Sequence, residues 1–145
     1  MTKEVTILIA EDDAGHARLI EKNLFRADLH NPIRRFENGQ QVIDFFFGKE
    51  KHEPDASYLL LLDIRMPKVD GTEVLRRLKQ DSELRKMPVI MLTTTDEPHE
   101  VARCHAFGCN NYLVKPVDYN KFAEAVKNLG LFISLVEVPQ INQPV

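Results

Sequence analysis

The sequence predicts an α/β fold in which a five-stranded parallel sheet is covered by helices on both faces. Strand-like and helix-like segments alternate five times along the 145 residues, a pattern that favours parallel strands joined by right-handed helical crossovers. The segment Tyr-Leu-Leu-Leu-Leu at 58–62 has no polar alternation, as expected for a strand buried on both faces. The length fits one domain. We assign residues 1–136 to that domain, with an extended last helix, and residues 137–145 to a C-terminal tail.

The first half of the chain supplies two strand–helix pairs. A run rich in β-branched residues ends at Glu11. Apolar residues then recur at helical spacing, and Asp13 is a suitable N-cap for that helix. Asn31-Pro32 and Asn38-Gly39 mark turns around a short strand. The expected elements are a strand at 5–10, a helix at 14–27, a strand at 33–36 and a helix at 40–47.

The second half continues the same alternation. The Leu-rich strand ends at Asp63, and the two later strands end at Thr93 and Lys115. Pro139 stops the last helix. The expected elements are a strand at 58–62, a helix carrying Val74, Leu75 and Leu78, a strand at 88–92, a helix at 98–107, a strand at 112–114, and a helix that Asp118 caps and that runs to about Val136.

Composition and charge narrow the classes of function. A net charge of −3 and a pI of about 5.9 leave no basic surface for nucleic acid or for an anionic membrane. No apolar run approaches the roughly 18 residues that span a bilayer, and we expect no signal peptide. Cys104 and Cys109 are expected as reduced thiols. The sequence therefore predicts a cytoplasmic protein that binds neither nucleic acid nor membrane.

The carboxyl ends of the predicted strands carry the candidate chemistry. Ligands of open α/β sheets bind at this edge, where the chain places Glu11, Asp12, Asp63, Thr93 and Lys115. Crowded carboxylates resist ionisation, and a divalent cation removes that conflict. Oxygen ligands of this kind suit Mg²⁺. Each residue alone is also typical of a helix cap, a turn or a surface loop, but their convergence favours a site for Mg²⁺ and a phosphoryl group on a carboxylate.

Four motifs at these strand ends resemble a known family. They are Ile-Ala-Glu-Asp-Asp at 9–13, Leu-Leu-Asp-Ile-Arg-Met-Pro-Lys-Val-Asp-Gly at 61–71, Leu-Thr-Thr at 92–94 and Tyr-Leu-Val-Lys-Pro at 112–116. Together they resemble the receiver domains of bacterial two-component response regulators, over residues 5 to about 130. The resemblance implies a flavodoxin-like receiver fold with strand order 2-1-3-4-5. It also implies a signalling phosphoprotein that catalyses its own phosphorylation and dephosphorylation, rather than an enzyme.

The resemblance further implies a role for each residue. Asp63 would be the phosphoacceptor, which forms an aspartyl phosphate with a group supplied by a histidine kinase. Lys115 and the backbone N–H of Thr94 would bind the phosphoryl oxygens. Thr93 and Tyr112 would form a switch that changes the surface of the fourth helix, fifth strand and fifth helix. The implied Mg²⁺ ligands are Glu11, Asp12, Asp63 and the backbone carbonyl of Arg65.

A narrower resemblance suggests the kinase. The segment 11–24, the long loop at 48–57 and the apolar C-terminal extension resemble stand-alone, single-domain regulators paired with bacterial phytochromes. The resemblance implies a bacteriophytochrome as the kinase partner. His16, within the first of these segments, is expected to be a surface residue without a chemical role.

The last helix predicts a homodimer. Apolar residues lie nearly all round it and its extension, and a helix of that kind must be buried. A single domain of this size cannot cover it, so a second copy is expected. The alternative is a longer last helix that folds back on its own domain. The expected interface residues are Leu131, Phe132, Leu135 and Val138.

Three other functions stay open at this point. An aspartate-nucleophile phosphatase would carry a second Asp two residues after its nucleophile, where this chain has Arg65. A phosphorylation-silent binding module would have no need of the acidic pair, Asp63 and Lys115. A nucleotide-binding flavodoxin-like domain would need a Gly-rich loop after the first strand, which this chain lacks.

Overall fold

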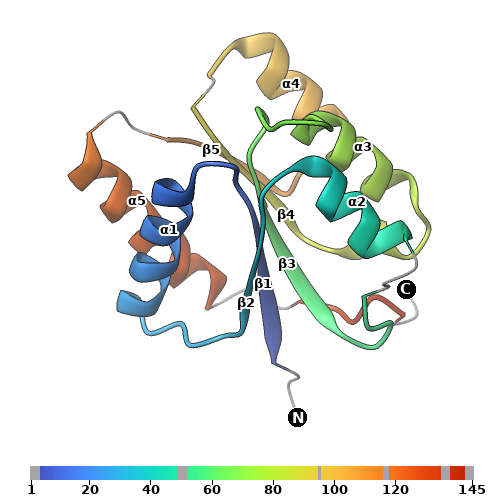
Figure 1. Ribbon diagram of the computed structural model, residues 1–145, viewed down its shortest axis with the longest axis horizontal. Helices are drawn as coiled ribbons and strands as arrows, with labels where there is room; N and C mark the ends of the chain where they lie inside the picture. The colour runs from blue at the N-terminus through green and yellow to red at the C-terminus, as the bar shows by residue number, and fades with distance from the viewer. Residues whose placement is uncertain (1–3, 49–51, 95, 116–117, 135–137, 143–145) are drawn as a thin grey trace.

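The protein has three layers, with a parallel sheet between two layers of helices (Figure 1). The computed structural model describes residues 4–48, 52–94, 96–115, 118–134 and 138–142. The sheet order β2-β1-β3-β4-β5 confirms the predicted topology. The strands are β1 (Val5–Ala10), β2 (Ile33–Phe36), β3 (Ser57–Leu62), β4 (Val89–Thr93) and β5 (Asn111–Val114).

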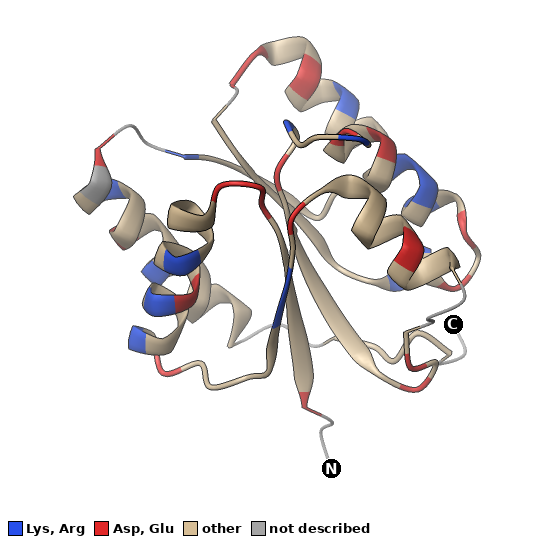
Figure 2. Ribbon diagram, in the orientation of Figure 1, with Lys and Arg blue, Asp and Glu red and all other residues tan. Residues whose placement is uncertain are grey.

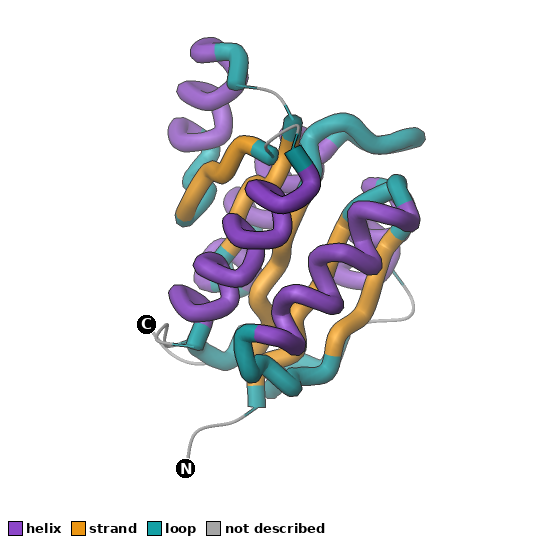
Figure 3. Tube along the Cα trace, turned by 90° about the vertical axis from the view of Figure 1, so that its left-hand side faces the viewer, coloured by secondary structure: helices purple, strands orange, loops and turns teal. Residues whose placement is uncertain are grey.

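The helices divide between the two faces of the sheet. Helices α1 and α5 lie side by side over one face, as Figure 3 shows, and α2, α3 and α4 cover the other (Figure 1). A short 3₁₀ helix, η1, precedes β4. The bounds are α1 (Ala14–Arg26), α2 (Gly39–Phe47), α3 (Gly71–Gln80), η1 (Leu84–Lys86), α4 (Pro98–Ala106) and α5 (Tyr119–Ile133).

The Leu run of β3 explains how one strand serves two hydrophobic cores. Leu60 and Leu62 belong to the cluster under α2, α3 and α4, whereas Leu59 and Leu61 belong to the cluster under α1 and α5. All four are at most 1% exposed. Successive side chains of a strand point to opposite faces, so a strand covered on both faces carries apolar residues at every position.

The C-terminal segment folds back on its own domain. The structure describes the last helix as far as Ile133, followed by Ser134; Val136, where we expected its end, lies outside the described residues. Beyond this gap, the N–H of Ile141 donates to Ala56 O and the N–H of Asn142 to Pro54 O, both at 3.1 Å. Ile141 is buried in the cluster under α2, α3 and α4. Residues 138–142 thus pack on their own domain, as in the alternative expectation, but they are not helical.

Within the described residues, none of the helices combines the length and the hydropathy that crossing a bilayer requires.

Candidate functional site

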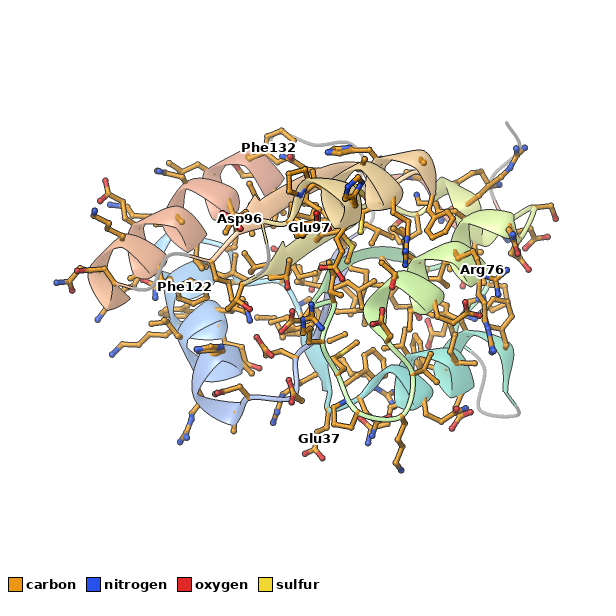
Figure 4. All side chains as sticks on the ribbon, turned by 90° about the horizontal axis from the view of Figure 1, so that it is seen from above. Glu37, Arg76, Asp96, Glu97, Phe122 and Phe132 are labelled. Carbon is orange, nitrogen blue, oxygen red and sulfur yellow. The ribbon has the colours of Figure 1, made fainter. Side chains whose placement is uncertain are left out.

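The predicted site residues meet at the carboxyl edge of the sheet. Glu11 and Asp12 follow β1, Asp63 follows β3 and Lys115 follows β5. Figure 2 shows the loop between β1 and α1 as an acidic stretch at this edge, and Figure 4 looks down onto it. Asp13 ends the loop, because its side chain accepts the N–H of His16 at 3.0 Å and caps α1. The cap holds the acidic pair at the junction of strand and helix.

Three carboxylates lie close enough to share one cation. Glu11, Asp12 and Asp63 each offer an oxygen within 4.8 Å of the others. Glu11 and Asp63 are buried, and Asp12 is exposed. An all-oxygen set of carboxylates with one open side fits a hard divalent cation that keeps several of its waters. The donor set therefore fits the Mg²⁺ that the sequence predicts.

The raised pKa of Glu11 also favours a cation site. Burial raises its pKa to about 7, and the charge of Asp63 adds to the rise, while Lys115 opposes it. Two carboxylates that share a buried site disfavour each other's ionisation. A bound cation would therefore stabilise the ionised form of Glu11.

The ammonium of Lys115 supplies a positive charge beside the carboxylates of Glu11 and Asp63. It is 3% exposed and donates to the carboxylate of Glu11 and, at 3.2 Å, to Oδ2 of Asp63. Nδ1 of the His16 ring lies 3.4 Å from it. Since the ammonium touches Asp63 directly, it is also placed to meet an anion attached to that carboxylate.

Hydrogen bonds and the close packing of Gly71 fix the backbone around Asp63. The N–H of Ile64 donates to Oδ1 of Asp63 at 2.7 Å, and the N–H of Asp63 donates to Ala10 O at 3.1 Å. Gly71, at the start of α3, packs against the same loop, and a Cβ there would stand 2.0 Å from Asp63 O. Only glycine fits this contact, which accounts for Gly71 in the motif.

Two predicted switch residues lie between the site and α4. Thr93 is fully buried, and within the described residues its hydroxyl has no hydrogen-bond partner. Thr94, next to it, is exposed. Tyr112 is half-buried, with its ring centroid 6.3 Å from that of His105. Burial first, and then the neighbouring Cys104 and Glu100, raise the pKa of Tyr112 to about 12, so the phenol stays neutral.

The side chain of Arg65 leaves the acidic site and reaches α4. It is 69% exposed, and its Nη2 lies 3.6 Å from Oε1 of Glu100. The second carboxylate oxygen of Glu100 is buried and, among the described residues, has no hydrogen-bond partner. The loop after β3 and the first turn of α4 are thereby linked by one ion pair.

Sequence reasoning missed two residues at this site. His16 lies at the surface as expected, with its side chain 44% exposed, but its Nδ1 is also 3.4 Å from Nζ of Lys115 and its ring centroid 5.7 Å from that of Phe122. Arg35, in β2, donates to the backbone carbonyls of Glu11 and Asp12. The position of His16 on the first turn of α1 offered a signal. An arginine in a short strand offers none, because it is typical of a surface residue.

The predicted interface residues of the last helix fall into three groups. Leu131 and Phe132 are 51% and 48% exposed, and Figure 4 shows Phe132 on the side of α5 away from α1. Val138 packs against the cluster under α1 and α5 of its own domain, which accounts for it without a second copy. Leu135 lies outside the described residues.

Comparisons with known proteins give consistent matches. The family model of the response regulator receiver domain matches residues 7–127. A response regulator receiver domain from Rhodospirillum rubrum has a TM-score of 0.89 at 43% identity, over 93% of this chain and 97% of that one. The Mn²⁺-bound response regulator Rcp1 has a TM-score of 0.84 at 27% identity, over 94% and 99% of the two chains. The bacteriophytochrome response regulator RtBRR has a TM-score of 0.67 at 34% identity, over 98% and 86%.

Proposed function

This chain belongs to the response regulator receiver domain family, and we propose that it accepts a phosphoryl group on Asp63 from a histidine kinase in a Mg²⁺-dependent reaction. Proteins of this family are signalling phosphoacceptors rather than classical enzymes. The observation that carries the proposal is the convergence of buried Asp63 with an acidic pair and with the ammonium of Lys115, 3.2 Å from its carboxylate.

The chemistry asks for little beyond positioning and charge neutralisation. One oxygen of Asp63 attacks the phosphorus of a phosphohistidine, the new O–P bond forms, and the P–N bond breaks with release of the imidazole. Lys115 pairs with one phosphoryl oxygen, and the backbone N–H of Thr94 donates to another. Hydrolysis of the acyl phosphate, which the chain also promotes in this proposal, transfers the group to water.

Four groups of this chain would hold the cation. They are the carboxylates of Glu11, Asp12 and Asp63 and the backbone carbonyl of Arg65. When bound, Mg²⁺ supplies positive charge between the attacking carboxylate and the phosphoryl oxygens. The three clustered carboxylates support this assignment, as does the Mn²⁺ that a structural neighbour binds.

Phosphorylation would be reported by Thr93 and Tyr112. The buried hydroxyl of Thr93 has no hydrogen-bond partner within the described residues, and a phosphoryl group on Asp63 would supply one. The side chain of Thr93 would then turn inward and leave space for the ring of Tyr112 to rotate. This rotation would change the surface formed by α4, β5 and α5. Such a change is a shift between two packings of one chain.

The phosphoacceptor assignment is tested with acetyl phosphate and Mg²⁺, followed by electrophoresis that retards phosphoproteins. The wild type should be labelled, Asp63→Asn should not, and Asp44→Asn, an exposed carboxylate of α2, should behave as the wild type. Labelling of Asp63→Asn at the wild-type rate would contradict the assignment. Hydrolysis of small phosphomonoesters would identify the phosphatase alternative, and an unlabelled wild type would favour the binding module.

A bacteriophytochrome is the kinase that we propose as phosphoryl donor. The similarity to RtBRR, a bacteriophytochrome response regulator, supports this choice. Transfer from a phosphorylated bacteriophytochrome should be faster than transfer from an unrelated histidine kinase at equal concentration, and red and far-red light should change its rate. Equal rates from both donors would contradict the pairing.

We further propose a homodimer that buries Leu131 and Phe132 of α5. Their exposure supports this, because full burial of such a side chain is worth about 1.5–3 kcal/mol. Light scattering after size exclusion should give twice the chain mass for the wild type and one chain mass for Leu131→Glu. Phe25→Glu is the control, since Phe25 is 63% exposed on a different helix. A wild type that stays monomeric at every concentration, with and without phosphorylation, would exclude the dimer.

A further inference from the structure

Arg35 of β2 binds the backbone of the acidic loop. Its Nε and Nη2 donate to the carbonyl oxygen of Glu11 at 3.0 and 2.9 Å, and Nη2 also donates to the carbonyl oxygen of Asp12 at 3.1 Å. The side chain is 24% exposed. Three donor–acceptor pairs at these distances are within the range of good hydrogen bonds.

The local geometry explains why these carbonyls need such a donor. The pairing of β1 with β2 continues to Ala10 opposite Phe36, and the N–H of Glu11 still donates to Phe36 O at 3.0 Å. Beyond that point both strands leave the sheet, β1 toward α1 and β2 toward α2. The register sets Arg35 opposite Ile9, so its long side chain reaches past the end of the ladder to the next two carbonyls of β1's exit loop.

The side-chain carboxylate and the backbone carbonyl of Glu11 are therefore held by two different basic residues. Lys115 contacts the carboxylate, and Arg35 holds the carbonyl. Asp12 has an exposed side chain, and its carbonyl shares Nη2 of Arg35. The planar guanidinium can grip two carbonyls at once, which a lysine ammonium does less well.

We infer that Arg35 is a positioning residue for the cation site: it fixes the backbone of Glu11 and Asp12 so that their carboxylates meet that of Asp63. The inference rests on the proposed Mg²⁺-dependent function. It assigns a role to a residue that touches neither the cation nor the phosphoryl group. Outer-shell partners of metal ligands typically change metal affinity by 10- to 100-fold when they are replaced.

The sign of the effect separates positioning from simple electrostatics. Removal of a positive charge near a cation site strengthens cation binding if charge alone matters. Loss of the backbone restraint weakens binding, because the two carboxylates must then be ordered when the cation arrives. Arg35→Gln should therefore weaken Mg²⁺ binding if the inference is right, and should strengthen it if Arg35 acts only through its charge.

Arg34 provides a matched control on the same strand. Its guanidinium lies over the ring of Phe45, 4.7 Å from the centroid, on the opposite face of β2 from Arg35. Arg34→Gln makes the same change in charge without touching the acidic loop. Arg35→Lys keeps the charge and loses the planar fork.

The experiment is calorimetric titration of the full chain with Mg²⁺ alone. Arg35→Gln should bind Mg²⁺ at least about tenfold more weakly than the wild type, Arg35→Lys should lie between the two, and Arg34→Gln should bind within about twofold of the wild type. Hydrogen exchange of the metal-free protein supplies a second readout. The peptide that covers 11–17 should exchange faster in Arg35→Gln than in Arg34→Gln, at equal urea midpoints.

Each outcome has a distinct meaning. Mg²⁺ binding by Arg35→Gln that is as tight as in the wild type, or tighter, would overturn the inference while leaving the proposed function intact. Failure of the wild type to bind Mg²⁺ and to be labelled by acetyl phosphate would remove the proposed function itself. If Arg35→Gln does not fold, Arg35→Lys decides the matter, since wild-type affinity in that folded variant also overturns the inference.

Discussion

Replacing Glu11 with Gln should stabilise the metal-free protein, by an amount that grows with pH. Burial, reinforced by Asp63, raises the pKa of Glu11 from 4.5 to about 7, although Lys115 opposes the rise. In the unfolded chain the carboxyl titrates near its ordinary value. Between these two pKa values the folded protein holds a proton that the unfolded chain has released, so folding stability falls as pH rises.

The size of the effect follows from the interval between the two pKa values. Each pH unit within it costs about 1.4 kcal/mol, so a pKa raised from 4.5 to about 7 corresponds to about 3 kcal/mol. The loss is absent below the lower pKa and complete above the upper one. Gln resembles the protonated carboxyl in shape and charge. Glu11→Gln should therefore equal the wild type near pH 4.5 and exceed it by about 3 kcal/mol near pH 8.

Urea denaturation in the presence of a chelator, from pH 4.5 to 8, measures this difference. The difference between variant and wild type removes the titration of carboxyls that the two proteins share. Asp44→Asn, which changes an exposed carboxylate, should give a flat difference curve. Mg²⁺ should reduce the advantage of Glu11→Gln, because the cation binds the ionised wild-type carboxylate. A flat difference curve for Glu11→Gln, or one that falls with rising pH, would refute the reasoning.

Further changes test the same site and its supports. Lys115→Ala removes the cation that lowers the pKa of folded Glu11, so in the same denaturation series the pH-dependent loss of stability should begin at the same pH but continue to higher pH and become larger. Gly71→Ala places a Cβ 2.0 Å from Asp63 O; we expect a loss of about 1–3 kcal/mol in urea and slower labelling by acetyl phosphate. Asp118→Ala removes the side chain that accepts the first N–H groups of α5, and thermal unfolding should report a loss of about 1 kcal/mol.

The strands were predictable because burial on both faces leaves a run without polar positions, whereas the strand order was implied only by the resemblance to receiver domains. The run Tyr-Leu-Leu-Leu-Leu at 58–62 has no polar alternation, and the structure buries all five residues. Asp63 and Lys115 each follow a predicted strand of a parallel sheet, and the carboxyl ends of parallel strands meet at one edge. The two residues could therefore be placed at the same edge before any contact was known.

The supports of the site were not predictable in the same way. Arg35 acts through backbone carbonyls that belong to another strand, and the contact depends on the register between β1 and β2. His16 reaches Lys115 across about a hundred residues of chain. Local sequence patterns contain no information on either pairing, because both arise only when the sheet and α1 are assembled.

The C-terminal segment shows a further limit of the sequence patterns. Val138 and Ile141 are isolated apolar residues among Pro, Gln and Asn, so no periodicity indicates where they pack. The structure places Val138 against one cluster and Ile141 in the other. The apolar excess beyond α5 is thus partly used within the domain, and the expected interface is reduced to Leu131 and Phe132 among the described residues.

The packing of residues 138–142 against the loop before β3 indicates when these contacts form during folding. The hydrogen bonds from Ile141 and Asn142 to Ala56 and Pro54 close a loop that contains more than half of the chain. Loop closure of this length is costly before the intervening sheet exists, so these contacts should form last on the folding pathway. Although Ile141 is buried, these contacts can open without breaking the sheet, and the amides of Ile141 and Asn142 should exchange by a local opening below the free energy of global unfolding.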